Sequence, residues 1–206
     1  MITNIFPTSV GWTHAGDFDL VKLRQEFAHK RELLDGACGP VRQAEYTEPR
    51  STSEYAVEDI LLTLALTQCE YMIDSAVRDY VQTLGSNSLL VRVKSWCDRI
   101  ENGSAHPWHA HAPSHISGTL YLQTTEGGDL EFRTPNPYAR AGYFPQLYDA
   151  TPVVQRTPRQ GDVGVWPAWL EHRVTPVDSD KPRYAISFDY VVHKGPAANT
   201  QDFEEL

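Results

Sequence analysis

The spacing of apolar residues changes once along this chain, and that change limits which folds it can adopt. Up to about Leu89, apolar side chains recur at helical spacing in two segments, 19–34 and 58–84, which end at Gly36 and Gly85. From Leu89 onward they recur at every second residue, as in a strand whose two faces differ. Helices first and strands afterwards predict an α+β fold in which the helices support one β-structure.

The second half of the chain predicts several short strands separated by turn residues. After the strand that begins at Leu89, we expect strands at 117–124, 129–133, 153–156, 163–166 and 184–192. Short strands of this kind favour a jelly roll, the cupin-like barrel also called a double-stranded β-helix. We predict a single domain over 1–206, with helical support in 1–88, the jelly-roll core in 89–193 and a loosely attached tail in 194–206.

Charge and cysteine content exclude several classes of protein. The formal net charge is −9 and no run of Lys or Arg is present, which argues against nucleic-acid binding. No apolar run is long enough to span a bilayer and the start lacks the pattern of a secretory signal, so we expect a cytoplasmic protein without a membrane partner. The three cysteines are scattered and form no CxxC pair, which predicts free thiols. The oligomeric state stays open, a homodimer included.

Histidines are concentrated in one short segment that could bind a metal ion. Four of the eight lie at positions 106, 109, 111 and 115. On an extended strand His109 and His111 project from the same face and could chelate one ion, and imidazole suits Fe, Zn, Cu or Ni. His172, after a Gly-Asp turn and an apolar strand, is the candidate third ligand. A lone HxH pair is a weak signal, and we expect His106 and His115 not to be primary ligands.

A second group of residues predicts a receptor for a carboxylate. Arg183 and Ser187 lie four residues apart, so on a strand both side chains face the same way. A guanidinium and a hydroxyl aimed inward together could bind a carboxylate, with two parallel bonds from the arginine. The alternative is a surface arginine, but the run from Ala185 to Phe188 is too apolar for an exposed edge strand. A buried arginine requires an anionic partner.

These motifs resemble those of the iron/2-oxoglutarate oxygenases. The order is His109-x-His111, then Gly161-Asp-x₄-Pro-x₄-His172, then Arg183-Tyr-Ala-Ile-Ser187, and it is most similar to a 2OG-Fe(II) oxygenase family common in bacteria and phages. The resemblance implies Fe(II) on the three histidines and O₂ and 2-oxoglutarate as co-substrates. It implies that Arg183, helped by Ser187 and Tyr121, binds the distal carboxylate of 2-oxoglutarate. The implied reaction is oxidative decarboxylation of 2-oxoglutarate to succinate and CO₂, coupled to hydroxylation or a related C–H oxidation of a small-molecule or peptidyl substrate.

The sequence departs from the usual pattern of these oxygenases at two positions. Most of them use two histidines and one carboxylate, and here His111 stands where Asp or Glu is usual. Asp129 or Glu171 could therefore replace one of the histidines as a ligand. Asp189 stands where the family tends to have Asn.

Two other functions fit parts of the pattern. The spacing Gly103-x₅-His109-x-His111-x₃-His115 also resembles a cupin motif, which would make the chain a metal-dependent dioxygenase or isomerase that does not use 2-oxoglutarate. Such a protein would not need Arg183 and Ser187. A non-enzymatic, ligand-binding jelly roll would explain the many aromatic residues but would leave the histidines unused. In the oxygenase interpretation, the Pro- and Tyr-rich segment 134–152 would line the substrate entrance.

Overall fold

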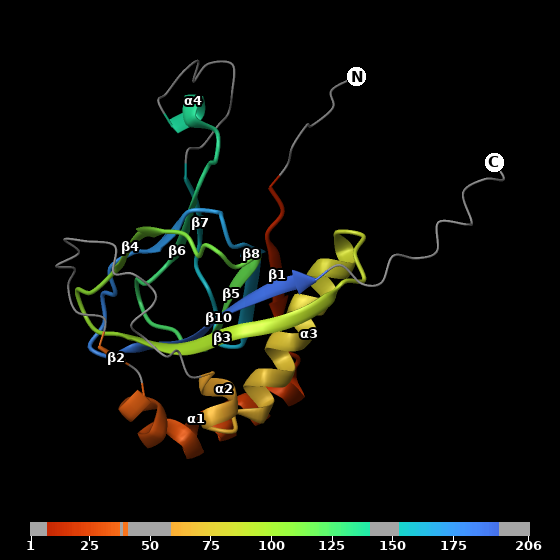
Figure 1. The fold of residues 1–206 in the computed structure, drawn as a ribbon. Helices are drawn as coiled ribbons and strands as arrows, with labels where there is room; N and C mark the ends of the chain where they lie inside the picture. Colours follow the sequence, from red (N-terminus) through yellow and green to blue (C-terminus); the bar gives the residue numbers. More distant parts are fainter. Residues whose placement is uncertain (1–7, 38, 41–58, 141–152, 194–206) are drawn as a thin grey trace.

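Two β-sheets and a layer of helices make up the chain (Figure 1). The structure is a computed structural model, and it describes residues 8–37, 39–40, 59–140 and 153–193. The six-stranded sheet has the order β1 (Gly11–His14), β8 (Asp162–Pro167), β5 (Ile116–Gln123), β10 (Arg183–His193), β3 (Leu89–Ile100) and β2 (Gly39–Pro40). The four-stranded sheet has the order β4 (His106–His109), β9 (His172–Val174), β6 (Leu130–Arg133) and β7 (Val153–Arg156).

The sheets face each other across an apolar layer. This layer takes Ile100 and Trp166 from the larger sheet and Leu130, Phe132 and Val174 from the smaller one. All strand pairs are antiparallel except β2 with β3. The predicted double-stranded β-helix architecture is therefore confirmed, in the form of two separate sheets; the described strands do not close into a barrel.

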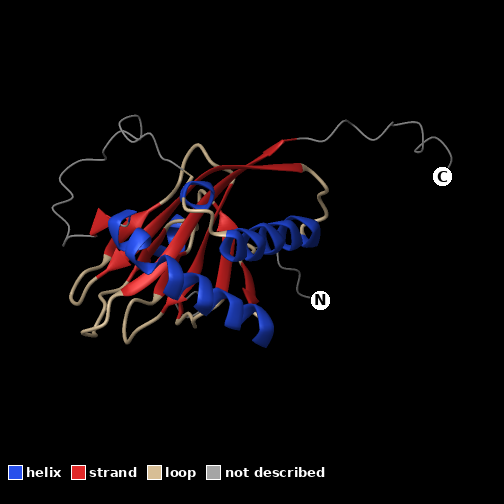
Figure 2. Cartoon of the chain, turned by 90° about the horizontal axis from the view of Figure 1, so that it is seen from below, coloured by secondary structure: helices blue, strands red, loops and turns tan. Residues whose placement is uncertain are grey.

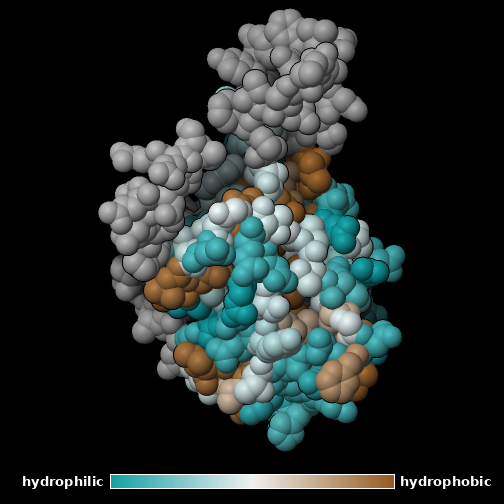
Figure 3. Space-filling view, turned by 90° about the vertical axis from the view of Figure 1, so that its right-hand side faces the viewer, coloured by the Kyte–Doolittle hydropathy of each residue, from teal (hydrophilic) through white to brown (hydrophobic). Residues whose placement is uncertain are grey.

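Helices cover the other face of the larger sheet (Figure 2). The helices are α1 (Asp17–Ala37), α2 (Ile60–Thr63), α3 (Thr67–Thr83) and the short α4 (Pro137–Arg140). Leu23 and Phe27 of α1 and Ile73 and Val77 of α3 are buried in one core with Phe188 of the central strand. On the side shown in Figure 3 the surface is mostly hydrophilic and its apolar side chains form small separate patches, which is ordinary for a folded chain. None of the described helices is long and apolar enough to cross a membrane.

The predicted helix over 58–84 is wrong as a continuous helix, because the chain turns between α2 and α3. Ala65 has a φ of +49°, in the left-handed region, and the N–H groups of Leu66 and Ala65 donate to the carbonyls of Leu61 and Leu62. These two bonds form a Schellman motif, which ends a helix most often at glycine. Burial of Leu66 accompanies the turn. The helical spacing of apolar residues continues through this turn, so the sequence pattern does not reveal it.

A β-bulge in β3 decides which of its side chains face the smaller sheet. Asp189 pairs with Lys94 while the next residue, Tyr190, pairs with Arg92, so Val93 is the extra residue. Before the bulge Arg92 points toward the helices, and after it Ser95 does so. The residues on either side of Ser95, together with Asp98, consequently face the smaller sheet.

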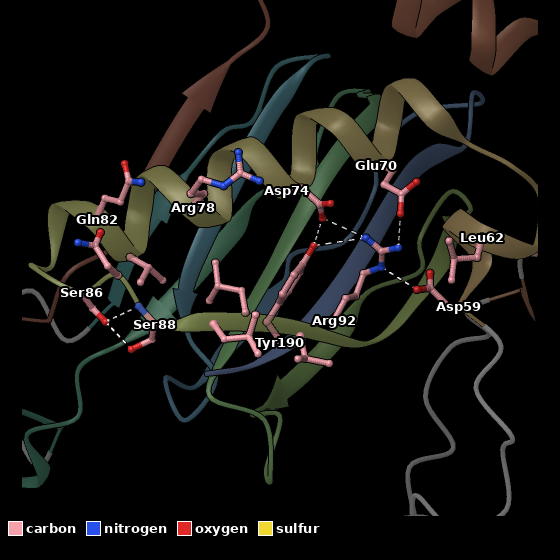
Figure 4. A pocket seen from close by; sticks show the side chains of 15 residues that line it. Asp59, Leu62, Glu70, Asp74, Arg78, Gln82, Ser86, Ser88, Arg92 and Tyr190 are labelled. Carbon is pink, nitrogen blue, oxygen red and sulfur yellow. Dashed lines mark hydrogen bonds and ion pairs between the residues drawn. The ribbon is translucent and has the colours of Figure 1, made fainter. Parts of the chain in front are cut away.

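Arg92 joins α2, α3 and β3 through three carboxylates (Figure 4). Its guanidinium nitrogens lie 2.7 Å from Asp59 Oδ2, 2.5 Å from Glu70 Oε1 and 3.0 Å from Asp74 Oδ1. Burial opposes its charge, but the bonds to Glu70 and Asp59 outweigh that effect and hold the pKa of Arg92 above its usual value. Tyr190 of β10 donates to Asp74 and extends the cluster to the central strand.

The expectation of free thiols holds for Cys69 and is wrong for Cys97. Cys69 is free and buried, whereas Cys97 is disulfide-bonded. The parallel pairing of β2 with β3 places Gly39 opposite Asp98, so a segment distant in sequence lies beside Cys97. Spacing between cysteines does not reveal such a pairing. Cys38, most of the segment 134–152 and the tail 194–206 lie outside the described residues.

Replacing Arg92 tests how much this cluster contributes to stability. Arg92→Met leaves three neighbouring carboxylates without their cation, and we expect the free energy of unfolding to fall by about 3 kcal/mol, since breaking a buried ion pair from one side costs roughly 3–5 kcal/mol. Urea unfolding at pH 7 measures the change. Arg78→Met is the control, because Arg78 is an exposed arginine of α3 that lines the same pocket as Arg92 (Figure 4), and its stability should stay within about 0.5 kcal/mol of the unchanged chain. Equal stability of the two variants would contradict this role for Arg92.

Candidate metal centre

The structure brings three of the predicted histidines together. His109, at the end of β4, is the register partner of His172, at the start of β9. His111 follows outside the strand, where its N–H donates to the carbonyl of Ala168 (2.8 Å). One nitrogen from each of the three rings lies within 4.8 Å of the other two. The sequence predicted His109 and His111 on one continuous strand, whereas the strand ends at His109. The two rings still converge with His172.

Hydrogen bonds fix which nitrogen of each ring is free. The Nδ1 atoms of His109 and His172 lie 2.7 Å and 2.9 Å from the carbonyl oxygens of Pro107 and Leu170, and Nδ1 of His111 lies 2.8 Å from Asp189 Oδ1. These oxygens can only accept, so each Nδ1 carries the proton. Each Nε2 then keeps its lone pair, which is the state that binds a metal ion.

The environment keeps two of these rings neutral. Burial, together with the neighbouring imidazoles, lowers the pKa of His172 to about 3 and that of His109 to about 4. Near neutral pH no proton competes for their Nε2 atoms. Three imidazoles on one side of a cavity form a ligand set that suits divalent iron and related transition metals.

The other candidate ligands do not join this group. Asp129 accepts a hydrogen bond from Gln155 (2.5 Å), and Glu171 pairs with Arg140 (2.6 Å). His115 accepts from the N–H of Val192 (3.0 Å). His106 lies beside His109, with its Nε2 3.7 Å from Asp98 Oδ1. Among the described residues, the only group with metal-binding spacing is the three histidines.

Arg183, on β10, is buried, and none of the described carboxylates lies at ion-pair distance from it. Only 3% of its surface is exposed, and its guanidinium lies 4.9 Å from the centre of the Tyr121 ring. Gly128 leaves room for it, because a Cβ there would lie 2.9 Å from Arg183 Cδ. Within the described part of the chain, neither Arg183 Nε nor the Tyr121 hydroxyl has a partner at hydrogen-bond geometry, although burial raises the pKa of Tyr121 and the nearby Arg183 guanidinium opposes that rise. Two buried donors are thus left for an anion.

Asp98 is a site residue that the sequence did not reveal. Ser187 donates to its Oδ2 (2.7 Å), and Thr119 lies 3.2 Å from the same hydroxyl. Burial opposes ionisation of Asp98, but His106, Ser187 and the charge of Arg183 hold its pKa below the usual value. A hydroxyl has one proton, so Ser187 cannot donate to Asp98 and to a bound anion at once.

One small cavity connects these groups. It is lined by the three histidines, Asp98, Arg183, Ser187 and Thr119, with Trp96, His106, Leu130 and Val174 completing the wall. Trp166 and Phe132 lie against His172, at ring distances of 5.0 Å and 6.2 Å, and keep that side apolar. The cavity therefore has a nitrogen ligand set at one place and a cationic anchor at another.

Comparisons with solved structures support the fold. A 2OG-Fe(II) oxygenase family oxidoreductase from Burkholderia pseudomallei is 17% identical, with a TM-score of 0.50 over 64% of this chain and 58% of that one, so this chain spans less than two thirds of its length. A Trichoplax adhaerens prolyl hydroxylase, solved with a hypoxia inducible factor peptide, is 16% identical with a TM-score of 0.56 (89% and 84% covered). HygX from Streptomyces hygroscopicus, solved with nickel and 2-oxoglutarate, is 16% identical with a TM-score of 0.53 (93% and 83% covered). No curated protein matches the sequence.

The family comparison agrees with the resemblance found in the motifs. Residues 94–189 match a family described as "Putative 2OG-Fe(II) oxygenase". This range includes the three histidines, Asp98 and Arg183. Over residues 94–189, this chain therefore matches the model of a 2OG-Fe(II) oxygenase family, in agreement with its motifs.

Proposed function

We propose that this chain is an Fe(II)- and 2-oxoglutarate-dependent dioxygenase. His109, His111 and His172 would hold the iron, and Arg183 would bind the distal carboxylate of 2-oxoglutarate. The proposal rests on one observation: a cavity is lined both by three histidines with free Nε2 atoms and by a buried guanidinium that pairs with no carboxylate of the described residues. The iron, when bound, supplies the O₂ activation that couples decarboxylation of 2-oxoglutarate to succinate and CO₂ with oxidation of a C–H bond.

The residues around Arg183 have distinct tasks in this proposal. The guanidinium supplies two parallel donors for a carboxylate, and the Tyr121 hydroxyl is free to add a third. Ser187 can assist only if it gives up its bond to Asp98. Asp98 places a negative charge in the same cavity, so it weakens the binding of an anion there.

For the substrate we propose a small molecule or a peptide side chain. The Trichoplax adhaerens neighbour was solved with a peptide, and the cavity of this chain is small and partly apolar. The net charge of −9 does not favour nucleic acid as a partner. We keep a cytoplasmic location and a homodimer as expectations from the sequence.

The cupin interpretation has less support. It would use His115, which lies outside the histidine group and accepts from a backbone N–H of β10. It also gives no purpose to the buried Arg183. A ligand-binding jelly roll without metal would leave three inward Nε2 atoms unused.

Removal of one histidine tests the iron site. Anaerobically reconstituted chain should hold about one Fe(II), and His172→Ala should abolish it because two imidazoles remain. His115→Gln is the control and should keep full occupancy. Metal analysis after desalting gives the result. Loss of iron in the His115 variant alone would favour the cupin interpretation instead.

Two substitutions in the cavity should move co-substrate affinity in opposite directions. Arg183→Lys loses the two parallel bonds, and we expect the Kd for 2-oxoglutarate to rise at least about tenfold, or about 1.4 kcal/mol. Asp98→Asn keeps an acceptor for Ser187 but removes a negative charge, so the Kd should fall. Anaerobic titration of the iron-loaded chain measures both values.

Turnover of 2-oxoglutarate is a second measurement on the Arg183→Lys and Asp98→Asn variants. Succinate formation without added substrate should follow the two Kd values. An iron-loaded chain that neither binds nor decarboxylates 2-oxoglutarate would overturn the proposed function.

A further inference from the structure

Asp189 is a fully buried carboxylate whose first contact is a proposed metal ligand. Its exposed fraction is 0%. Oδ1 accepts from His111 Nδ1 (2.8 Å) and from Ser117 Oγ (2.5 Å), and Oδ2 lies 2.9 Å from Lys94 Nζ. Every contact except His111 comes from the larger sheet.

The sheet holds Asp189 in place from both sides. It is the register partner of Lys94 on β3 and of Ser117 on β5, so the three residues form one row across the centre of the sheet. A side chain in the middle of three paired strands has little freedom to move, and here its position is set by backbone hydrogen bonds on both edges of β10. His111 lies outside the strands and takes its ring orientation from this fixed point.

The other two histidines are held differently. Their Nδ1 atoms donate to carbonyls two residues earlier in their own segments, those of Pro107 and Leu170. Those acceptors are neutral dipoles. Among the three, only His111 donates to an ionised side chain, and only His111 stands where most oxygenases of this kind have a carboxylate ligand.

We infer that Asp189 is a positioning residue that supplies, through His111, the negative charge that a carboxylate ligand would have given the metal. A carboxylate that accepts from Nδ1 raises the basicity of Nε2 on the same ring and fixes its orientation. Three neutral imidazoles alone would leave the site without that charge. The inference rests on the proposed iron site.

Lys94 limits the size of this effect. Its ammonium pairs with Asp189 Oδ2, but 28% of its side chain is exposed, so water also solvates the charge. It lies 4.8 Å from the centre of the Trp96 ring, which in turn contacts His111. Removal of Lys94 should therefore leave the negative charge of Asp189 without its cationic partner, and it should not weaken metal binding.

The test compares metal affinity in variants that keep the shape of the site. Asp189→Asn keeps an acceptor for His111 but removes the charge, and we expect the Kd for Fe(II) or Co(II), measured by anaerobic calorimetry, to rise about 10–100-fold. The matched control is Asp162→Asn. Asp162 is also a buried carboxylate paired with a histidine, but that histidine is His14 (2.7 Å), which is not one of the three proposed ligands, so this variant should keep the affinity of the unchanged chain.

A double variant keeps the test decisive if Asp189→Asn alone perturbs the fold. His111→Asp puts a carboxylate at the ligand position itself, so the charge that Asp189 supplies through the imidazole is no longer needed there. Adding Asp189→Asn to His111→Asp should therefore cost much less metal affinity than Asp189→Asn costs in the unchanged chain. A merely structural role predicts the same loss in both backgrounds.

The possible failures are distinguishable. If the unchanged chain binds metal and Asp189→Asn binds it equally well, the inference is overturned and the proposed function stands. If Asp189→Asn weakens binding by the same factor with and without His111→Asp, the inference is also overturned. If the unchanged chain binds no metal at all, the proposed function fails first.

Discussion

The alternation of side chains along β10 is the constraint on which both the core and the site depend. Arg183 and Ser187 line the cavity and Asp189 contacts His111 on the same side, while Ile186, Phe188 and Tyr190 are buried in the core beneath the helices. The strand is paired along both edges, with β3 and with β5. Phe188 requires a glycine opposite it, since a Cβ on Gly118 would lie 2.3 Å from its ring. A shift of β10 by one residue would exchange core and site together.

The sequence predicted the parts of the site that depend on residue type and spacing. The three histidines and Arg183 were found in this way, because imidazoles two apart and a returning strand are visible as patterns. Asp98 was missed because strict alternation from Leu89 places it on the same face as Arg92. The extra residue Val93 reverses the faces, and only the register of β3 against β10 reveals it.

Other misses have similar physical causes. The strands β4 and β9 are four and three residues long, too short for an alternation to be read, although they hold His109 and His172. The turn between α2 and α3 uses Ala65 where glycine would have been a signal. The bonding of Cys97 and the bond from Ser187 to Asp98 depend on which strands are neighbours, and that is a property of the fold and not of local sequence.

The charged side chains around the cavity balance one another before any ligand binds. Arg183 and Lys94 carry positive charges, Asp98 and Asp189 carry negative ones, and the three histidines are held with Nδ1 protonated and Nε2 free. In the proposed function, Fe(II) brings two positive charges and 2-oxoglutarate two negative ones, so the pair adds no net charge to the buried site. Either one alone would leave an uncompensated double charge in a region of low dielectric, where that is costly. Iron and 2-oxoglutarate are therefore expected to strengthen each other's binding, an effect that arises from their mutual neutralisation as well as from direct chelation.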